Sequence, residues 1–203
     1  AAAFWSGFDQ SAGSFTIFTR DYVKLSFGFF EAPVSWTQFI NPLFIIILAP
    51  FFSSLWIFLG RKNLDPSMPM KFSIGLLFMA GGFFIILYAV KLALVTSSVG
   101  VQWLLITYLL HTFGELTLSP VGLSAFSKYS PKKYLGQMMG IWFLASSLGG
   151  VLAGLFGGKA SEQGLDSLSE VFTELIIYYL VIAIIIFILS FFIKGTVYKD
   201  IEG

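Results

Sequence analysis

The stretch FINPLFIIILAPFFSSLW, residues 39–56, is almost wholly apolar, yet it carries an Asn-Pro pair near its start and a second proline further along. With its flanks, the apolar run extends over residues 36–60. About 20 such residues are enough to cross the hydrocarbon core of a bilayer as a helix. The stretch therefore predicts a transmembrane helix that is interrupted by polar and proline residues.

The composition of the whole chain supports a membrane protein. Of its 203 residues, 57% are hydrophobic and 11% are charged, against about 25% charged in ordinary soluble domains. A soluble fold of this length could not bury so much apolar surface. The net charge of +1 indicates no nucleic-acid partner, and the absence of cysteine excludes disulfides and thiolate metal sites. With a single histidine as well, no metal site or bound cofactor is expected.

Six apolar segments suggest an all-α integral membrane fold with six transmembrane helices. Four are clear on composition: residues 36–60, 71–97, 134–158 and 171–194. A fifth, residues 101–127, is clear except for HTFGELTLSPVG at 111–122. The sixth, residues 1–20, is interrupted by several polar side chains and cannot face lipid on all sides. We expect its polar side to line a cavity.

The distribution of basic residues predicts the orientation. The 12 basic residues divide eight to four between the two sides of the expected topology. The richer side holds Arg61, Lys62, Lys71, Lys128, Lys132, Lys133, Lys194 and Lys199. The positive-inside rule then places both termini of this segment in the cytoplasm, in a multi-pass protein of the cell (inner) membrane. Because residues 1–10, AAAFWSGFDQ, lack a methionine and a basic signal-peptide region, we expect a piece of a longer protein.

Residues 111–122 place ionisable groups and a helix breaker inside an expected span. Glu115 lies near the middle of the span, where a carboxylate must face a cavity or a partner or be protonated. His111 is four residues earlier and is expected on the same helical face. Pro120 removes the hydrogen bond to the carbonyl of Leu116. This pattern favours a functional mid-membrane site at Glu115; for His111, an ordinary structural role is favoured.

Three further groups are candidates for the same kind of site. Asp9, with Trp5 one turn earlier, is a second acid expected to be buried, although a position near water would make it an ordinary solvated acid. Asn41, next to Pro42, can donate and accept hydrogen bonds, which suits an amine or amide group; the pair could equally be a helix-entry motif. Trp142 and Ser146 are spaced to form one wall of a pocket; the alternative is that they lie in the core or face lipid.

Three of these motifs, in order along the chain, resemble the proton-dependent oligopeptide transporter (POT) family of the major facilitator superfamily. They are FWSGFDQSAGS at residues 4–14, FINPLFIIILAPFFSSLW at 39–56 and FGELTLSPVGLS at 113–124. The resemblance covers essentially the whole chain and is to the family's helices seven to twelve. It implies that residues 1–203 form the C-terminal six-helix bundle of a major facilitator fold.

The resemblance also implies roles for individual residues. It assigns substrate binding to Asn41, Glu115, Trp5, Trp142 and Ser146, and proton coupling to Asp9 and Glu115. On a looser alignment, the resemblance also assigns Asp21 to an outer-gate acid. The implied function is proton-coupled symport of di- and tripeptides by alternating access, with no cofactor beyond protons as the coupling ion. The implied partners are small peptides, protons, the lipid bilayer and an N-terminal six-helix half.

The family's N-terminal bundle, with its ExxERFxYY-type motif, is absent from this chain. Two alternatives therefore stay open. One is a major-facilitator transporter of a non-peptide solute such as nitrate or a glucoside. The other is a non-transporting membrane protein, either an intramembrane enzyme or a scaffold. The sequence contains no HExxH or GxSxG motif, so we expect no enzyme.

Overall fold

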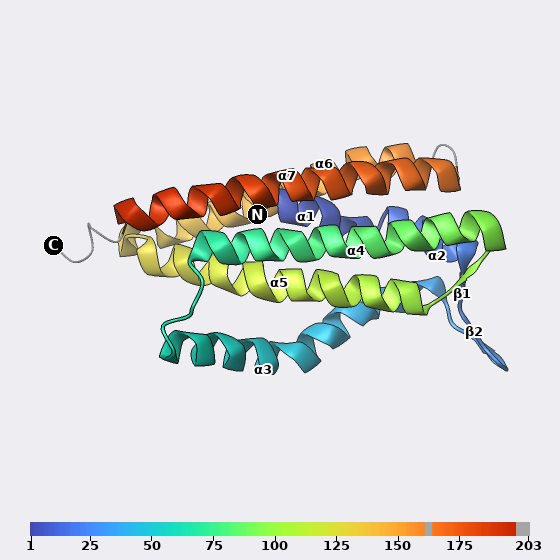
Figure 1. Ribbon diagram of the computed structural model, residues 1–203, viewed down its shortest axis with the longest axis horizontal. Helices are drawn as coiled ribbons and strands as arrows, with labels where there is room; N and C mark the ends of the chain where they lie inside the picture. The colour runs from blue at the N-terminus through green and yellow to red at the C-terminus, as the bar shows by residue number, and fades with distance from the viewer. Residues whose placement is uncertain (161–163, 198–203) are drawn as a thin grey trace.

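The computed structural model describes residues 1–160 and 164–197 as a bundle of long helices that run side by side (Figure 1). The helical elements are α1 (Ala2–Phe8), η1 (Asp9–Ser11), α2 (Ser14–Tyr22), η2 (Val34–Phe39), α3 (Ile40–Arg61), α4 (Met68–Thr96), α5 (Gln102–Tyr129), η3 (Lys132–Tyr134), α6 (Leu135–Ala160) and α7 (Leu165–Val197). The strands are β1 (Val23–Lys24), β2 (Ser26–Phe27), β3 (Phe30–Glu31) and β4 (Val99–Gly100).

Four of the described helical segments are long and apolar enough to cross a membrane. They are Val34–Arg61, Met68–Thr96, Lys132–Ala160 and Leu165–Phe192. These are the four segments that composition alone made clear, so the all-helical membrane class is confirmed. Helix α5 is 28 residues long but carries the polar residues of HTFGELTLSPVG in its middle. The count of six membrane crossings stays a prediction.

The first expected span is a broken helix. Instead of one helix over residues 1–20, the structure has α1, the 3-10 turn η1 and α2, with Gly13 outside helical geometry at φ −98° and ψ −106°. The buried side chain of Gln10 bridges the break: its Nε2 donates to the Ser6 carbonyl at 3.3 Å, and its Oε1 accepts from Ser14 Oγ at 2.7 Å. The polar residues that weakened the sequence signal therefore satisfy groups that the break exposes.

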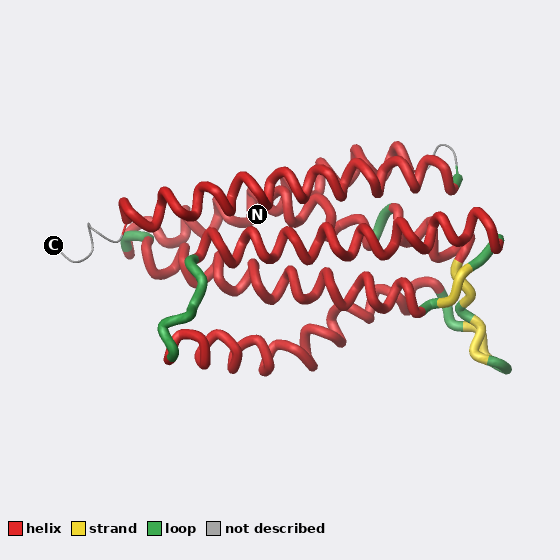
Figure 2. The backbone as a smooth tube through the Cα atoms, viewed as in Figure 1, coloured by secondary structure: helices red, strands yellow, loops and turns green. Residues whose placement is uncertain are grey.

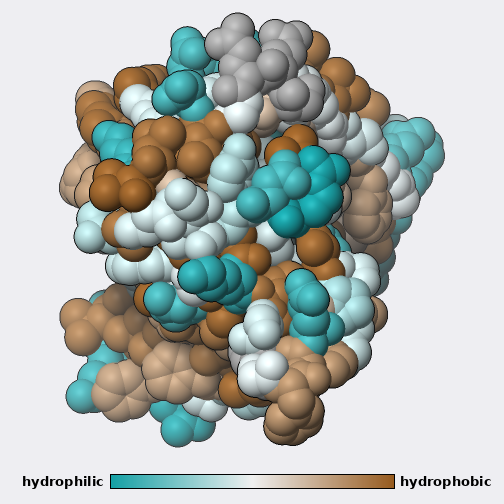
Figure 3. Space-filling model, turned by 90° about the vertical axis from the view of Figure 1, so that its right-hand side faces the viewer, coloured by the Kyte–Doolittle hydropathy of each residue, from teal (hydrophilic) through white to brown (hydrophobic). Residues whose placement is uncertain are grey.

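The strands are short additions at one end of the bundle (Figure 2). β2 and β3 form a two-residue hairpin, and β1 pairs in parallel with β4. The hairpin turns at Gly28, whose φ of +75° favours glycine. Hydrophilic and hydrophobic side chains are interspersed on this end of the molecule (Figure 3). The α3–α4 and α5–α6 connections lie at the opposite end (Figure 2). These connections belong to the side that is richer in basic residues, so both lie at one end, as the expected topology requires. Lys199 lies outside the described residues.

Helix α4 is the inner helix of the bundle. It lies between α5 and α7 (Figure 1) and packs extensively on both. In the most apolar 18-residue stretch of α4, 61% is buried within the chain. The same measure is only 6% for the α3 span. Helix α3 contacts the rest of the bundle chiefly through α5. Its wide apolar surface is otherwise uncovered by this chain, which makes α3 the most loosely held of the long helices.

Helix α1 is held by close contacts with α6 and α7. The Tyr179 hydroxyl on α7 donates to the Ala3 carbonyl at 2.8 Å and lies 3.2 Å from Ser6 Oγ. On α6, Gly149 lies against α1, and only the absence of a side chain allows this approach. The Nε2 of Gln10 adds a hydrogen bond to the Ala153 carbonyl of α6 at 3.0 Å. Together these contacts fix the broken first segment against two long helices.

We expect Gly149→Ala to destabilise the protein, because the added methyl would lie 2.6 Å from Trp5 Cβ and 2.8 Å from the Ala2 carbonyl oxygen. Overpacking of this kind costs about 1–3 kcal/mol. Gly154→Ala on the same helix is the matched control, since its methyl would meet nothing within 4 Å. The control should be neutral, or more stable by up to about 1 kcal/mol. Thermal unfolding of the full-length protein in detergent measures both, and equal shifts would contradict the packing argument.

Candidate functional site

Asn41 is placed by the start of α3. The chain runs through the 3-10 helix η2 and enters α3 at Ile40, so Asn41 and Pro42 lie in the first turn of the helix. The pair lies within the apolar span Val34–Arg61, as expected, but at the start of its α-helical part, and Pro50 is the proline inside α3. Proline in a first turn costs no intrahelical hydrogen bond. The backbone therefore has the geometry of a helix-entry motif here. The Asn41 side chain also contacts a second helix, α5.

A hydrogen-bonded cluster joins α3 to α5. The Asn41 side-chain amide Nδ2 donates to Glu115 Oε2 and to Thr112 Oγ1, both at 3.0 Å. Asn41 is buried and Glu115 is half-buried. The Thr112 hydroxyl donates in turn to the Tyr108 carbonyl at 2.7 Å. The arrangement holds a half-buried carboxyl group between two helices, where it could accept a hydrogen bond from a cation.

His111 does not share these partners, although it lies four residues before Glu115. Its ring is buried, stacks on Phe15 with centroids 5.6 Å apart, and lies 4.9 Å from the Phe83 ring. It also packs closely against Gly82 of α4. Within the described part of the chain, its Nε2 has no hydrogen-bond partner. His111 therefore faces the aromatic core beside α4, whereas Glu115 faces α3.

Asp9 and Trp5 lie together on the side of α1 and η1 that faces α6. Trp5 approaches Gly149, and the Asp9 carboxylate is directed at the next residue, Gly150. Both side chains are half-buried, and the Trp5 ring stands edge-on to Phe8 at 5.1 Å. Among the residues that the structure describes, the Asp9 carboxylate has no hydrogen-bond or ion-pair partner. Among the described residues, Asp9 is thus an acid without a fixed counter-charge, and it faces glycines of α6.

Trp142 and Ser146 belong to the packing of α6. The Trp142 ring is 3% exposed, lies against Gly122 of α5, and stands edge-on to Phe126 at 5.5 Å. Ser146 is half-buried and donates to the Trp142 carbonyl at 3.3 Å. In this conformation, the Trp142 ring packs in the core, which is the alternative to forming a pocket wall. Their part in a substrate pocket stays a prediction.

Asp21 lies past the end of the expected span 1–20, near the end of α2. The neighbouring Arg20 donates to both of its carboxylate oxygens, at 2.7 and 2.9 Å. These hydrogen bonds hold the pKa of the Asp21 carboxyl below its usual range. Both side chains are exposed, so the pair is screened by water and contributes little to stability. Its possible use as a gate stays a prediction.

The predicted residues thus form separate groups. Asn41 and Glu115 meet between α3 and α5, whereas Asp9 and Trp5 face α6. No hydrogen bond or ion pair between described residues links the two groups. Thr112 was not among the predicted site residues, although its position three residues before Glu115 places it on a neighbouring part of the same helix face.

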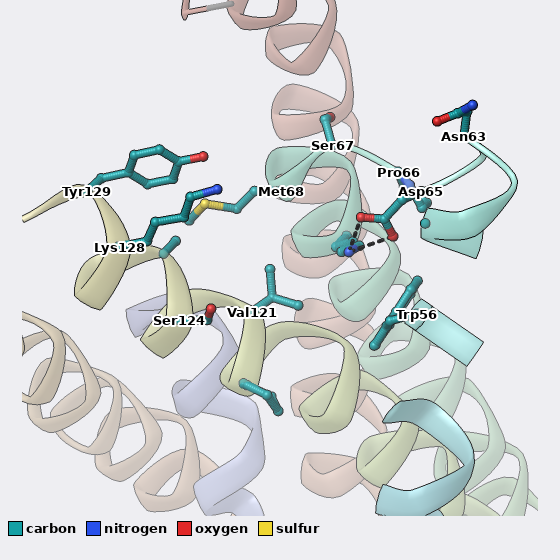
Figure 4. A pocket seen from close by; sticks show the side chains of 14 residues that line it. Trp56, Asn63, Asp65, Pro66, Ser67, Met68, Val121, Ser124, Lys128 and Tyr129 are labelled. Carbon is teal, nitrogen blue, oxygen red and sulfur yellow. Dashed lines mark hydrogen bonds and ion pairs between the residues drawn. The ribbon is translucent and has the colours of Figure 1, made fainter. Parts of the chain in front are cut away.

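A separate cavity of about 720 Å³ opens at the end of the bundle that holds the α3–α4 connection (Figure 4). Lys128 and Tyr129 extend from α5 on one side, and Asp65 lies in the connection on the other. The buried Lys71 pairs with Asp65 at 2.8 Å, and its ammonium lies 4.5 Å from the centre of the Trp56 ring. These contacts tie the end of α3 to the start of α4.

Known proteins with similar sequences include peptide transporters. The chain is 44% identical over 191 residues to "Peptide transporter YePEPT" of Yersinia enterocolitica subsp. palearctica, covering 93% of this chain and 37% of that protein. It is 35% identical over 151 residues to a di-/tripeptide transporter of Lactococcus lactis subsp. cremoris, covering 72% of this chain and 30% of that protein. The chain therefore spans well under half the length of these relatives.

Solved structures share the fold. A peptide transporter POT in complex with sulfate matches with a TM-score of 0.83 at 31% identity, covering 93% of this chain and 37% of that one. A POT family transporter in complex with 5-aminolevulinic acid matches with a TM-score of 0.80 at 30% identity, covering 93% of this chain and 38% of that one.

The sequence profile described as PTR2, POT family, matches residues 1–163, which include the three motifs that carried the resemblance. The resemblance is therefore confirmed at the level of sequence, fold and named relatives. This chain belongs to the POT family.

Proposed function

We propose that this chain supplies the C-terminal six-helix half of a proton-coupled symporter of di- and tripeptides in the cell (inner) membrane. The observation that carries the proposal is the contact between Asn41 and Glu115, which holds a half-buried carboxyl group between α3 and α5. An N-terminal six-helix half would supply the other wall of the cavity. Transport would follow the alternating-access scheme.

Glu115 is suited to bind the ammonium group of a peptide. A carboxylate in a membrane span is costly without a cationic partner, and a peptide amino terminus would supply one. The Asn41 amide contributes a hydrogen bond to the carboxylate at 3.0 Å, which limits that cost while the substrate is absent. A charged hydrogen bond between substrate and carboxylate would be stronger than this neutral donor can provide.

The named relatives agree with a substrate that carries an amino group. One relative is a di-/tripeptide transporter, and one solved relative holds 5-aminolevulinic acid, which has a primary amine. An ammonium and a carboxylate are common to these molecules, and neither nitrate nor a glucoside has an ammonium. The relatives therefore support peptides over nitrate or a glucoside as the substrate class.

Asp9 is suited to carry the coupling proton. It is half-buried, faces the glycines of α6, and has no fixed cation among the described residues. An acid with a stable ion pair would stay ionised through a transport cycle, whereas one without a fixed partner can exchange a proton as its surroundings change. Glu115 would share this task when no substrate ammonium is present.

The loose packing of α3 is suited to a moving part. Only 6% of the most apolar 18-residue stretch of the α3 span is buried within this chain. Asn41 connects the first turn of α3 to Glu115. A substrate that binds at Glu115 would therefore act directly on the contact that holds the start of α3. A membrane scaffold would have no need for a polar contact at this position, which disfavours the non-transporting alternative.

We expect Glu115→Gln, in the complete transporter, to weaken the binding of peptides with a free amino terminus at least about tenfold. The substitution preserves the shape of the side chain but removes the charge that pairs with the ammonium. Loss of one partner of a desolvated charge pair costs about 2–5 kcal/mol. Competition by free and N-acetylated forms of one dipeptide measures the effect, and the acetylated form should lose little.

Glu174→Gln is the matched control for this experiment. Glu174 is half-buried on α7 and pairs with the exposed Lys159 at 3.0 Å, away from the candidate site. The control should bind both dipeptides as the wild type does. Equal losses for free and acetylated dipeptides in Glu115→Gln would mean that Glu115 acts through structure or protonation, and the ammonium assignment would be rejected.

We expect Asp9→Asn to abolish proton-driven accumulation of peptide in proteoliposomes while largely preserving exchange of peptide across the membrane. Exchange carries no net proton, so it does not need the coupling acid. Asp9→Glu restores a carboxyl group and should recover part of the accumulation. If Asp9→Asn still accumulates peptide against its gradient, Asp9 is not the essential coupling acid.

A further inference from the structure

The Thr112 hydroxyl has a restricted role in the cluster, because its single hydrogen is already used. Thr112 Oγ1 donates to the Tyr108 carbonyl, one turn earlier on α5, at 2.7 Å. A threonine hydroxyl has one hydrogen to donate and can accept through its lone pairs. Toward Asn41, at 3.0 Å, Thr112 can therefore act only as an acceptor.

This restriction determines which end of the Asn41 amide faces α5. The two neighbours of the amide Nδ2, Thr112 Oγ1 and Glu115 Oε2, both lie at 3.0 Å. An ionised carboxylate only accepts hydrogen bonds. If the amide were turned over, its carbonyl oxygen would face two acceptors and no donor. A protonated Glu115 could donate to the carbonyl, and Thr112 would then be the neighbour that keeps the NH2 group in place.

We propose that Thr112 is a positioning residue that fixes the orientation of the Asn41 amide and so prepares the site for a substrate ammonium. With the NH2 group held against α5, the carbonyl oxygen Oδ1 of Asn41 accepts no hydrogen bond from any described residue. Oδ1 is then available as a second acceptor beside the Glu115 carboxyl. This inference rests on the proposed function and adds a residue to the same site.

The opposite orientation would harm the site for a simple electrostatic reason. It would place the NH2 group, which carries partial positive charge, where the substrate ammonium needs an acceptor. One hydrogen bond would be lost and a repulsion would replace it. The hydroxyl of Thr112 therefore affects binding through Asn41, without any need to touch the substrate itself.

Thr117 offers a matched control on the same helix. Its hydroxyl donates to the Phe113 carbonyl at 2.7 Å, as that of Thr112 does to Tyr108, and its side chain is also buried. Unlike Thr112, it makes no hydrogen bond to another helix among the described residues. Thr117→Val therefore reproduces the loss of a buried hydroxyl and of its bond to the helix backbone, but leaves Asn41 untouched.

The test compares Thr112→Val, Thr112→Ser and Thr117→Val in the full-length transporter. Valine has nearly the shape of threonine without the acceptor, whereas serine keeps the hydroxyl. Affinities are measured for one dipeptide with a free amino terminus and for its N-acetylated form. We expect Thr112→Val to bind the free form about three- to tenfold more weakly, the effect of one hydrogen bond. The acetylated form should be unaffected, and Thr112→Ser and Thr117→Val should resemble the wild type.

A double-mutant cycle with Asn41→Ala separates positioning from packing. If Thr112 acts through Asn41, Thr112→Val should cause no further loss in the Asn41→Ala protein. Equal losses for both dipeptides, a matching loss in Thr117→Val, or full additivity in the cycle would overturn the inference while leaving the proposed function intact. If Thr112→Val does not fold, Thr112→Ala is judged by the same criteria. A wild type that binds free and acetylated dipeptides equally would overturn the proposed function and, with it, this inference.

Discussion

The hydrogen bond between Asn41 and Glu115 joins the most loosely held long helix to the rest of the molecule. Helix α3 buries little of its surface in this chain, and its first turn meets α5 through this 3.0 Å contact. In an apolar environment neither group can be left without a partner at low cost. The hydrogen bond between the two side chains therefore keeps the start of α3 against α5. It also leaves the Glu115 carboxyl group where a ligand could compete for it.

In the first segment, the groups that need hydrogen-bond partners belong to the backbone, because the helix is interrupted. Gly13 leaves helical geometry, and the backbone groups that this frees need other hydrogen-bond partners. Gln10 supplies the replacement, because one amide side chain reaches Ser6, Ser14 and Ala153 on three helices. The break is therefore stabilised by side-chain hydrogen bonds and by the glycine contact with α6, the helix that Asp9 and Trp5 face.

The parts of the fold that the sequence predicts well are those governed by one-dimensional rules. A bilayer requires a minimum length of apolar helix, so four spans and the helical class follow from composition. Asn41 and Glu115 could also be singled out as candidates, because a polar residue in a span requires a hydrogen-bond partner, and the structure pairs the two. Their pairing with Thr112, the break at Gly13 and the separate surroundings of His111 depend on how the helices rotate and pack, and helical spacing alone does not determine that.

The two groups of polar residues lie on different helix pairs, which limits how they could influence each other. Asn41 and Glu115 join α3 to α5, whereas Asp9 and Trp5 face α6. A change in one group can reach the other only through packed contacts, since no described hydrogen bond links them. The Trp142 ring on α6 lies against Gly122, two residues beyond Pro120, where α5 lacks one backbone hydrogen bond. A change in the bend of α5 at this proline would press directly on that ring, and so on the helix that Asp9 faces.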